Sequence, residues 1–221
     1  TELAASVVLG CGQFCTNPGL VVGIRSPHFE HFLQTLVARM ADQGPQTMLN
    51  AGTLRSYQNA VQHLLAHPGI QHLAGQPQTG NQAQPQLFKA DVSLLLNGDP
   101  LLQEEVFGPC TVVVEVADAQ QLAEALRHLQ GQLTATLIAE PDDLHAFASL
   151  VPLLERKAGR ILVNGFPTGV EVGEAMVHGG PYPASTNFGA TSVGTLAIRR
   201  FLRPVAYQNF PKDLLPNDAN P

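Results

Sequence analysis

The sequence has no tryptophan, only 3 cysteines and few charged residues, 14% of 221. Three unevenly spaced thiols are too few for the disulfide framework of a small secreted domain, and no basic and apolar leader opens the chain. We therefore expect a protein of the reducing cytoplasm. The chain begins at Thr1, directly before a predicted amphipathic helix over Glu2–Leu9, and we expect it to be part of a longer protein.

Basic residues are scarce as well, since 12 lysines and arginines face 18 aspartates and glutamates and leave a net charge of −6. Nucleic-acid-binding proteins usually concentrate positive charge on one face. The one basic cluster here, Arg199, Arg200 and Arg203, is typical of a solvated helix end. Apolar runs such as Val112–Val114 are far shorter than the roughly 20 residues of a membrane span. We expect neither a nucleic-acid nor a membrane partner.

The hydrophobic content, 44%, suffices to fill the core of one large domain with or without an appendage. Short β-branched runs alternate with segments of helical periodicity, which predicts an α/β fold, an open mixed sheet with helices on both faces. The expected helices cover Glu2–Leu9, Pro27–Met40, Thr53–His67, Ala119–Leu129 and Asp142–Lys157. The expected strands cover Leu20–Ile24, Leu87–Ala90, Ser93–Leu96, Thr111–Val116, Thr134–Ala139 and Arg160–Val163.

The final third changes character, because glycines and prolines between residues 165 and 183 predict a long irregular segment. A short helical stretch near Val193–Leu202 and an extended strand over Arg203–Phe210 follow. We therefore expect two parts, a domain over residues 1–202 and a C-terminal strand and tail over residues 203–221.

One thiol stands in a polar turn, Gly12-Gln13-Phe14-Cys15-Thr16-Asn17-Pro18-Gly19. Backbone N–H groups in such a turn can point at an anion, which favours the reactive thiolate form. The other two thiols, Cys11 and Cys110, stand beside glycine or proline and apolar residues, and we expect them to be structural.

A second motif, Glu104-Glu105-Val106-Phe107-Gly108-Pro109, follows about 90 residues later. Adjacent carboxylates alone usually lie in solvent, but the Phe-Gly-Pro that follows fixes a turn. A third, Gly159-Arg160-Ile161-Leu162-Val163-Asn164-Gly165-Phe166-Pro167, reads as a strand that ends in a loop.

These three motifs resemble the catalytic domain of the aldehyde dehydrogenases. The resemblance implies that Cys15 attacks the aldehyde carbon, and that Glu105 and Phe107 hold the nicotinamide end of NADP or NAD. It also implies a substrate pocket lined by Phe14, Thr16, Phe166, Val170 and His178. The family's general-base Glu, its oxyanion-hole Asn and most of its dinucleotide site precede the cysteine, where this chain has only 14 residues. The resemblance therefore implies a catalytic domain without its N-terminal cofactor domain, which would be its partner.

Within the family, the amino-acid sequences of four segments resemble those of bacterial 2,5-dioxovalerate dehydrogenases. The related fatty-aldehyde enzymes are the alternative. The segments are Gly12–Gly19, Asn164–Val172, His178–Ala184 and Phe201–Pro211. In the resembling family the strand equivalent to 203–210 joins subunits, which implies a homo-oligomer.

Two other classes of function fit the same residues. A thiolate in this turn could serve a cysteine-dependent esterase, although no histidine is near Cys15 in sequence. The chain could also be a non-catalytic assembly module. Pairs such as His28 with His31 lack further ligands at a convincing spacing, and we expect no metal site.

Overall fold

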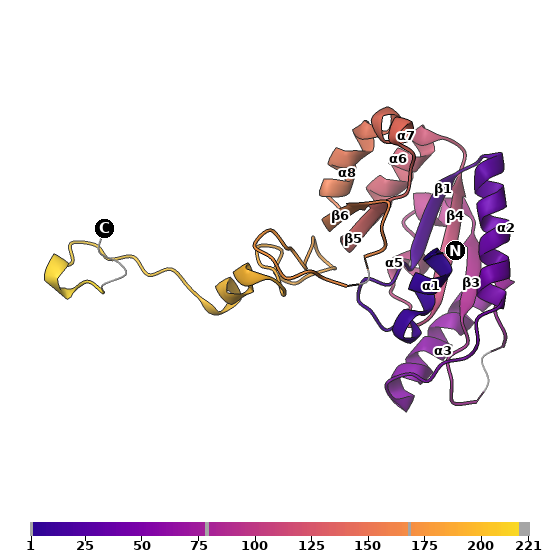
Figure 1. Cartoon of the computed structure of the whole chain (residues 1–221), viewed down its shortest axis with the longest axis horizontal. Coiled ribbons are helices and arrows are strands. Elements are labelled where there is room, and N and C mark those ends of the chain that lie inside the picture. Colours follow the sequence, from indigo (N-terminus) through magenta and orange to yellow (C-terminus); the bar gives the residue numbers. More distant parts are fainter. Residues whose placement is uncertain (1, 78–79, 168, 217–221) are drawn as a thin grey trace.

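The computed structural model describes residues 2–77, 80–167 and 169–216. An α/β body is followed by a long C-terminal segment that extends away from it (Figure 1). Residues 202–216 of this segment are called the C-terminal arm. None of the helices in these ranges has both the length and the apolar character that crossing a bilayer demands. The strands are β1 (Leu20–Ile24), β2 (Ile70–Ala74), β3 (Gln86–Ala90), β4 (Cys110–Val116), β5 (Gln132–Leu137) and β6 (Ala158–Val163). The α-helices are α1 (Glu2–Val8), α2 (Pro27–Ala41), α3 (Ala51–Ala66), α4 (Val92–Leu96), α5 (Pro100–Gln103), α6 (Ala119–His128), α7 (Pro141–Ala146) and α8 (Val151–Glu155). The 3-10 helices are η1 (Leu9–Gly12), η2 (Ala148–Leu150), η3 (Thr195–Phe201) and η4 (Lys212–Leu214).

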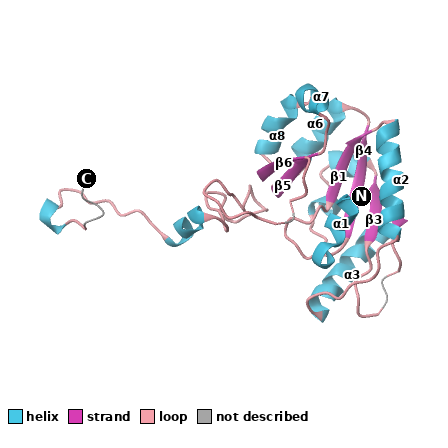
Figure 2. Cartoon of the chain, in the orientation of Figure 1, coloured by secondary structure: helices cyan, strands magenta, loops and turns pink. Residues whose placement is uncertain are grey.

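The strands form a four-stranded sheet in the order β1-β4-β3-β2 and a two-stranded sheet of β5 and β6 (Figure 2). In the larger sheet, β4 pairs in parallel with both β1 and β3, while β2 runs antiparallel to β3. Strands β5 and β6 are parallel. The mixed α/β architecture expected from the sequence is confirmed, with the strands divided between two sheets.

The central strand β4 has helices on both of its faces. Because side chains alternate along a strand, Val112 and Val114 pack with Tyr57 of α3 in one core cluster. Val113 points to the opposite face and packs with residues of α1 and α2 in a second cluster. Burial on both faces explains why β4 is almost uniformly apolar rather than alternating with polar residues.

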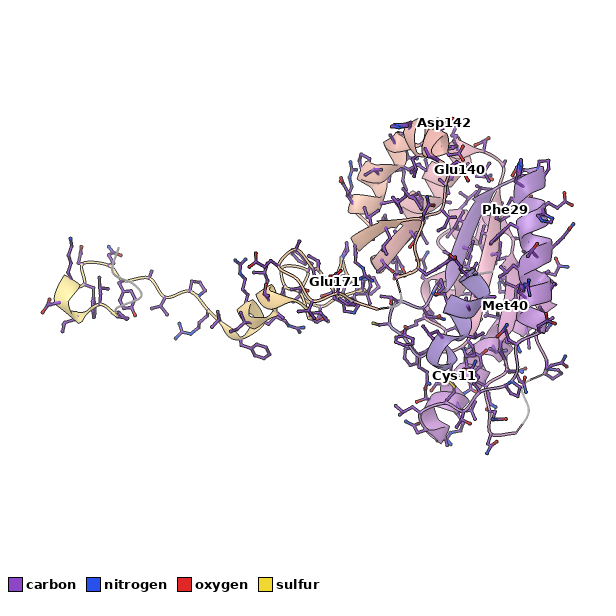
Figure 3. The ribbon with its side chains drawn as sticks, in the orientation of Figure 1. Cys11, Phe29, Met40, Glu140, Asp142 and Glu171 are labelled. Carbon is purple, nitrogen blue, oxygen red and sulfur yellow. The ribbon has the colours of Figure 1, made fainter. Side chains whose placement is uncertain are left out.

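Helix α2 begins where the sequence predicts it. The Ser26 hydroxyl accepts a hydrogen bond from the Phe29 backbone N–H at 3.1 Å, and Pro27 occupies the first turn, where its missing N–H costs nothing. Phe29 and Met40, labelled in Figure 3, pack against the second core cluster from the two ends of this helix.

Three local predictions are wrong. Residues Ser93–Leu96 belong to helix α4 instead of a strand, because a short apolar run carries no clear period. The single helix expected over Asp142–Lys157 is interrupted, with Pro152 opening the separate helix α8. Strand β2 was not expected, since its sequence Ile-Gln-His-Leu-Ala alternates poorly and relies on pairing with β3.

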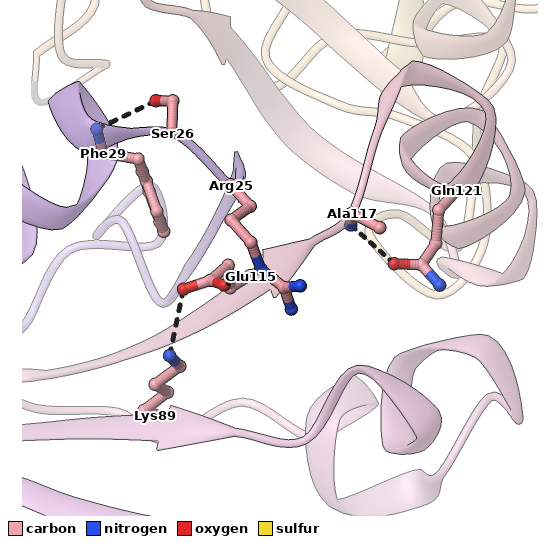
Figure 4. A network of polar contacts seen from close by, with 7 residues as sticks. All are labelled: Arg25, Ser26, Phe29, Lys89, Glu115, Ala117 and Gln121. Atoms are coloured by element: carbon pink, nitrogen blue, oxygen red, sulfur yellow. Dashed lines mark hydrogen bonds and ion pairs between the residues drawn. The ribbon is translucent and has the colours of Figure 1, made fainter.

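A charged contact joins three adjacent strands at one end of the sheet. Glu115 of β4 accepts hydrogen bonds from Arg25, directly after β1, at 2.6 Å and from Lys89 of β3 at 3.0 Å (Figure 4). The hydrogen bond from Arg25, together with Lys89, lowers the pKa of the Glu115 carboxyl. One carboxylate therefore links both neighbours of β4.

The C-terminal arm forms no strand within residues 202–216 of the single chain. Its apolar side chains, among them Leu202, Val205, Tyr207 and Phe210, are exposed. The Tyr207 and Phe210 rings contact each other with centroids 5.2 Å apart. A strand over 203–210 remains a prediction, because an edge strand needs a partner to pair with.

Candidate active site

The turn that carries Cys15 is held against the Glu-Glu-Val-Phe-Gly-Pro motif. Gly12 has a φ of +64°, and a Cβ on it would collide with the backbone of Gly108, so only glycine fits there. The Asn17 side chain donates to the Gly108 carbonyl at 3.1 Å. The Gln13 side-chain oxygen accepts from the Leu49 N–H at 2.8 Å. Two motifs about 90 residues apart in sequence are thus brought together at one turn.

The Cys15 thiol is exposed and lies 3.2 Å from Nε2 of His178. Burial and the positive charge of Arg160 lower the pKa of His178. A lowered pKa extends the pH range in which the imidazole is neutral, and a neutral ring nitrogen can accept the proton of a thiol. The geometry is therefore that of a nucleophile next to a base.

Hydrogen bonds on both sides of its backbone fix His178. Its N–H donates to the Thr191 hydroxyl at 2.8 Å, and its carbonyl accepts from the Ser192 hydroxyl at 2.9 Å. Thr191 is buried and its hydroxyl donates in turn to Val193. These bonds hold the backbone of His178 in place and do not use its ring nitrogens.

The glycines after His178 allow backbone to pack on backbone. A Cβ on Gly159 of β6 would collide with the carbonyl of Gly179, and a Cβ on Gly180 would collide with the carbonyl of Gln132 of β5. The segment that begins at His178 therefore lies directly on the two-stranded sheet, and this packing places His178 at the site.

Thr16, next to the nucleophile, is buried and donates its hydroxyl to the carbonyl of Pro167 at 3.1 Å. The same carbonyl accepts a hydrogen bond from Nη2 of Arg160 at 2.8 Å. Thr16, expected in the substrate pocket, therefore also ties the Cys15 turn to the segment after β6.

The motif residues Glu105 and Phe107 precede Gly108 on the exposed side of the same turn. Phe107 is 37% exposed. Within the described residues, Glu105 makes no hydrogen bond or ion pair, and partial burial raises the pKa of its carboxyl. Both side chains are thus available to a ligand.

The remaining expected pocket residues do not all gather at the thiol. Phe14 covers Gly10, where a Cβ would meet its ring at 2.7 Å, and is partly exposed. Phe166 packs against the second core cluster, on the side of α1 and α2. Val170 is partly buried in the segment after β6.

The other two cysteines are buried in the first core cluster. Burial raises the pKa of the Cys11 thiol and raises that of Cys110 to about 12. Both predictions of a structural cysteine are therefore confirmed. Among the residues that the structure places, no group of three or more metal-ligating side chains comes together.

Sequence reasoning missed the roles of Arg160 and Thr191. The signal for Arg160 was a cation inside an otherwise apolar strand, Ala158–Val163. Thr191 carried no signal, because its contact with His178 depends on how the glycine-rich segment folds back.

The sequence of residues 1–202 matches the sequence model of the aldehyde dehydrogenase family. The chain is 54% identical to alpha-ketoglutaric semialdehyde dehydrogenase of Acinetobacter baylyi and 46% identical to alpha-ketoglutaric semialdehyde dehydrogenase 2 of Azospirillum brasilense. All of the chain aligns with each relative, but it spans only 43% of their length.

Solved structures share the fold at low identity. Delta-pyrroline-5-carboxylate dehydrogenase of Mycobacterium tuberculosis superposes with a TM-score of 0.72 at 17% identity, over 96% of this chain and 42% of that one. Lactaldehyde dehydrogenase of Escherichia coli superposes with a TM-score of 0.71 at 18% identity, over 91% and 42%. Together with the family match and the meeting of the two motifs at the Cys15 turn, these findings show that the chain belongs to the aldehyde dehydrogenase family.

Proposed function

We propose that residues 1–202 are the thiol-bearing catalytic domain of an NAD(P)-dependent aldehyde dehydrogenase. Its proposed substrate is alpha-ketoglutarate semialdehyde, also called 2,5-dioxovalerate, and its product is 2-oxoglutarate. The observation that carries the proposal is the exposed Cys15 thiol 3.2 Å from His178. The names of the 54% and 46% identical relatives support the choice of aldehyde.

In the proposed first step, the Cys15 thiol gives its proton to Nε2 of neutral His178. The sulfur forms a bond to the aldehyde carbon, and the carbonyl π electrons move to oxygen as an oxyanion. The backbone N–H of Cys15 is one proposed donor to this oxyanion. A second donor would come from the region that precedes this chain in its longer relatives.

Glu105 and Phe107 would hold the nicotinamide end of NADP or NAD, which would supply the acceptor for the hydride of the former aldehyde carbon. The product left on Cys15 is a thioester. Water then attacks the thioester carbon, a base takes the proton of that water, and the carboxylic acid leaves as the thiol is restored. His178 is the base that this chain itself offers at the sulfur: it first releases to solvent the proton taken from Cys15, then takes a proton from the attacking water and passes it to the departing thiolate.

Glu105 and Phe107 fit the nicotinamide end of NADP or NAD. The Glu105 carboxyl has no partner in the described part of the chain, and could accept hydrogen bonds from a ribose diol. The exposed Phe107 ring offers a flat apolar face to the nicotinamide. The rest of the cofactor would be bound by the N-terminal domain.

Phe14 and Thr16 flank the nucleophile in sequence, and we propose that they border the aldehyde pocket with Val170. The exposed edge of the Phe14 ring would contact the substrate chain. Phe166 would support the aldehyde pocket from the core side, since its ring packs in the core.

The same pair favours a second candidate, a cysteine-dependent esterase. A thiolate next to a histidine can attack an activated ester without any cofactor. Hydrolysis of p-nitrophenyl acetate that is lost in Cys15→Ser, in a protein that reduces neither NADP nor NAD, would favour this alternative.

We further propose a homo-oligomer of the reducing cytoplasm. The C-terminal arm exposes backbone groups and apolar side chains that a second copy could cover by strand pairing. The three cysteines are all free thiols, which is consistent with a reducing compartment.

The test uses the complete protein, at the length of the relatives of which this chain spans 43%. Alpha-ketoglutarate semialdehyde and a long-chain fatty aldehyde are supplied with NADP or NAD, and the absorbance of the reduced cofactor is followed. The semialdehyde should have the higher kcat/KM, and Cys15→Ser should abolish its oxidation. A preference for the fatty aldehyde would overturn the proposed choice of substrate. An active Cys15→Ser enzyme would overturn the proposed role of Cys15 as the nucleophile.

The 221-residue chain alone is the matched comparison. Glu105 and Phe107 contact only one end of a large, flexible dinucleotide, which is too little to offset its loss of freedom on binding. Calorimetry should therefore detect no NADP binding to the chain alone, and micromolar affinity would contradict the assignment of the cofactor site to a missing domain.

A further inference from the structure

Arg160 of β6 is a cation without a carboxylate partner among the described residues. The ion pairs found there both involve Glu115 of β4. The Arg160 Nε atom is buried and has no hydrogen-bond partner within the same part of the chain. A guanidinium in such surroundings costs free energy unless its charge and donors are used.

Its other donors bind the segment that follows β6. Nη2 donates to the Pro167 carbonyl at 2.8 Å, and Nη1 donates to the Gly169 carbonyl at 3.3 Å and lies 3.9 Å from Sδ of Met176. Pro167 is buried and its carbonyl also accepts from Thr16, the residue after the nucleophile. One carbonyl thus connects Arg160 to the Cys15 turn.

The same guanidinium also contacts the segment that carries His178, since Nη1 lies 3.9 Å from Sδ of Met176, two residues before His178. Burial lowers the pKa of His178, and the positive charge of Arg160 lowers it further. The titratable and charged groups around His178 are Cys15 on its turn, Arg160 on β6 and Arg200 on η3. Arg200 lines a cavity of about 310 Å³ together with His178.

We propose that Arg160 is a positioning residue of the candidate active site, which ties the Cys15 turn to β6 through Pro167 and places an unpaired positive charge against the segment that carries His178. The inference rests on the proposed function for the roles of Cys15 and His178. It assigns to one strand residue the placement of the nucleophile and a share in the protonation state of its base.

The test measures the rate at which iodoacetamide alkylates Cys15 in the complete protein, mapped by mass spectrometry, between pH 4.5 and about 8. The rate of each protein is divided by the rate of the same protein that also carries His178→Gln. This ratio gives the contribution of His178. In Arg160→Gln, the pH at which this contribution is half lost should rise, because the imidazolium is no longer repelled. Arg200→Gln is the matched control, since Arg200 also lines the cavity but is not among the causes of the lowered pKa of His178, and this substitution should leave that pH unchanged.

Arg160→Lys separates the tether, which is the hydrogen bond from Arg160 to the Pro167 carbonyl, from the positive charge of the side chain. Lysine keeps the charge but lacks the planar fork, so the half-loss pH should stay while the rate falls several-fold at every pH. This variant also serves if Arg160→Gln does not fold, with folding checked by circular dichroism.

An Arg160→Gln profile identical to that of the original protein would overturn the inference, and so would an equal shift in Arg200→Gln. An Arg160→Lys rate equal to that of the original protein would overturn the tether. Because alkylation needs neither aldehyde nor cofactor, these failures differ from failure of the proposed function. That failure would appear instead as an unreactive Cys15 or as no effect of His178→Gln.

Discussion

The Sγ atom of Cys15 lies 3.2 Å from Nε2 of His178, although 163 positions separate them in sequence. The contact joins a turn after η1 to a glycine-rich segment after β6. It answers the objection raised above to a cysteine-dependent esterase, which was that no histidine lies near Cys15 in the sequence.

Cys15 should be the first of the three thiols to react. It is exposed, while Cys11 and Cys110 are buried and burial raises the pKa of both thiols, to about 12 for Cys110. Limiting iodoacetamide followed by mass mapping should place the first label on Cys15. Preferential labelling of Cys11 or Cys110 would overturn the assignment.

His178→Gln should slow the alkylation of Cys15 about 100-fold at neutral pH, the lower end of the range for loss of a general base. Because burial and Arg160 lower the pKa of His178, its neutral form persists below the ordinary value for histidine. The difference between the two proteins should therefore disappear only as the pH falls through this lowered pKa. His128→Gln changes an exposed histidine at the end of α6 and should have no effect.

If the difference between the His178→Gln and original proteins instead vanished above pH 6.5, or were absent at all pH values, His178 would not be the base.

Glu115→Gln should reduce the free energy of unfolding by about 1 kcal/mol, the upper range for a partly exposed ion pair. Hydrogen bonding to Arg25, with help from Lys89, lowers the folded-state pKa of Glu115. Its contribution is therefore complete above the unfolded pKa of roughly 4.3 and is lost as the pH falls through the lower folded value. Urea unfolding at neutral and acid pH measures the difference.

Glu155→Gln is the control, since Glu155 is exposed and makes no ion pair in the part of the chain described here. Equal destabilisation by the two substitutions, or a Glu115 effect that grows in acid, would contradict this account.

Truncation after Leu202 should shift the sedimentation of the chain toward the monomer. Residues 203–210 are exposed and form no strand alone, so their backbone groups are free to pair with another copy. Truncation after Phe210 is the control, because it removes η4 but keeps the proposed strand. An untruncated chain that stays monomeric at high concentration would show that these residues do not suffice for assembly.

Much of the fold could be predicted because its signals are local. Ser26 and Pro27 mark the start of α2, and the β-branched run of β1 is bounded as expected. Helix α4 was mistaken for a strand although its stop was visible, since Gly98 with a φ of +64° directly follows Asn97.

The candidate site was only half predictable. The Cys15 turn and the motif Glu104–Pro109 are each a continuous stretch of sequence and could be recognised there, and their close approach depends on the glycines at both contact points. The bonds of Arg160 to Pro167 and of Thr191 to His178 depend on the path of a long irregular segment, which has no period to read.

The central claim is that Cys15 carries the substrate as a covalent intermediate. The complete protein is mixed with alpha-ketoglutarate semialdehyde and NADP, quenched in acid within one turnover, digested and analysed by mass spectrometry. We expect the acyl group of 2-oxoglutarate on the peptide that contains Cys15, and no adduct in Cys15→Ser. An adduct on a different residue, or oxidation of the semialdehyde by Cys15→Ser at the original rate, would contradict the claim.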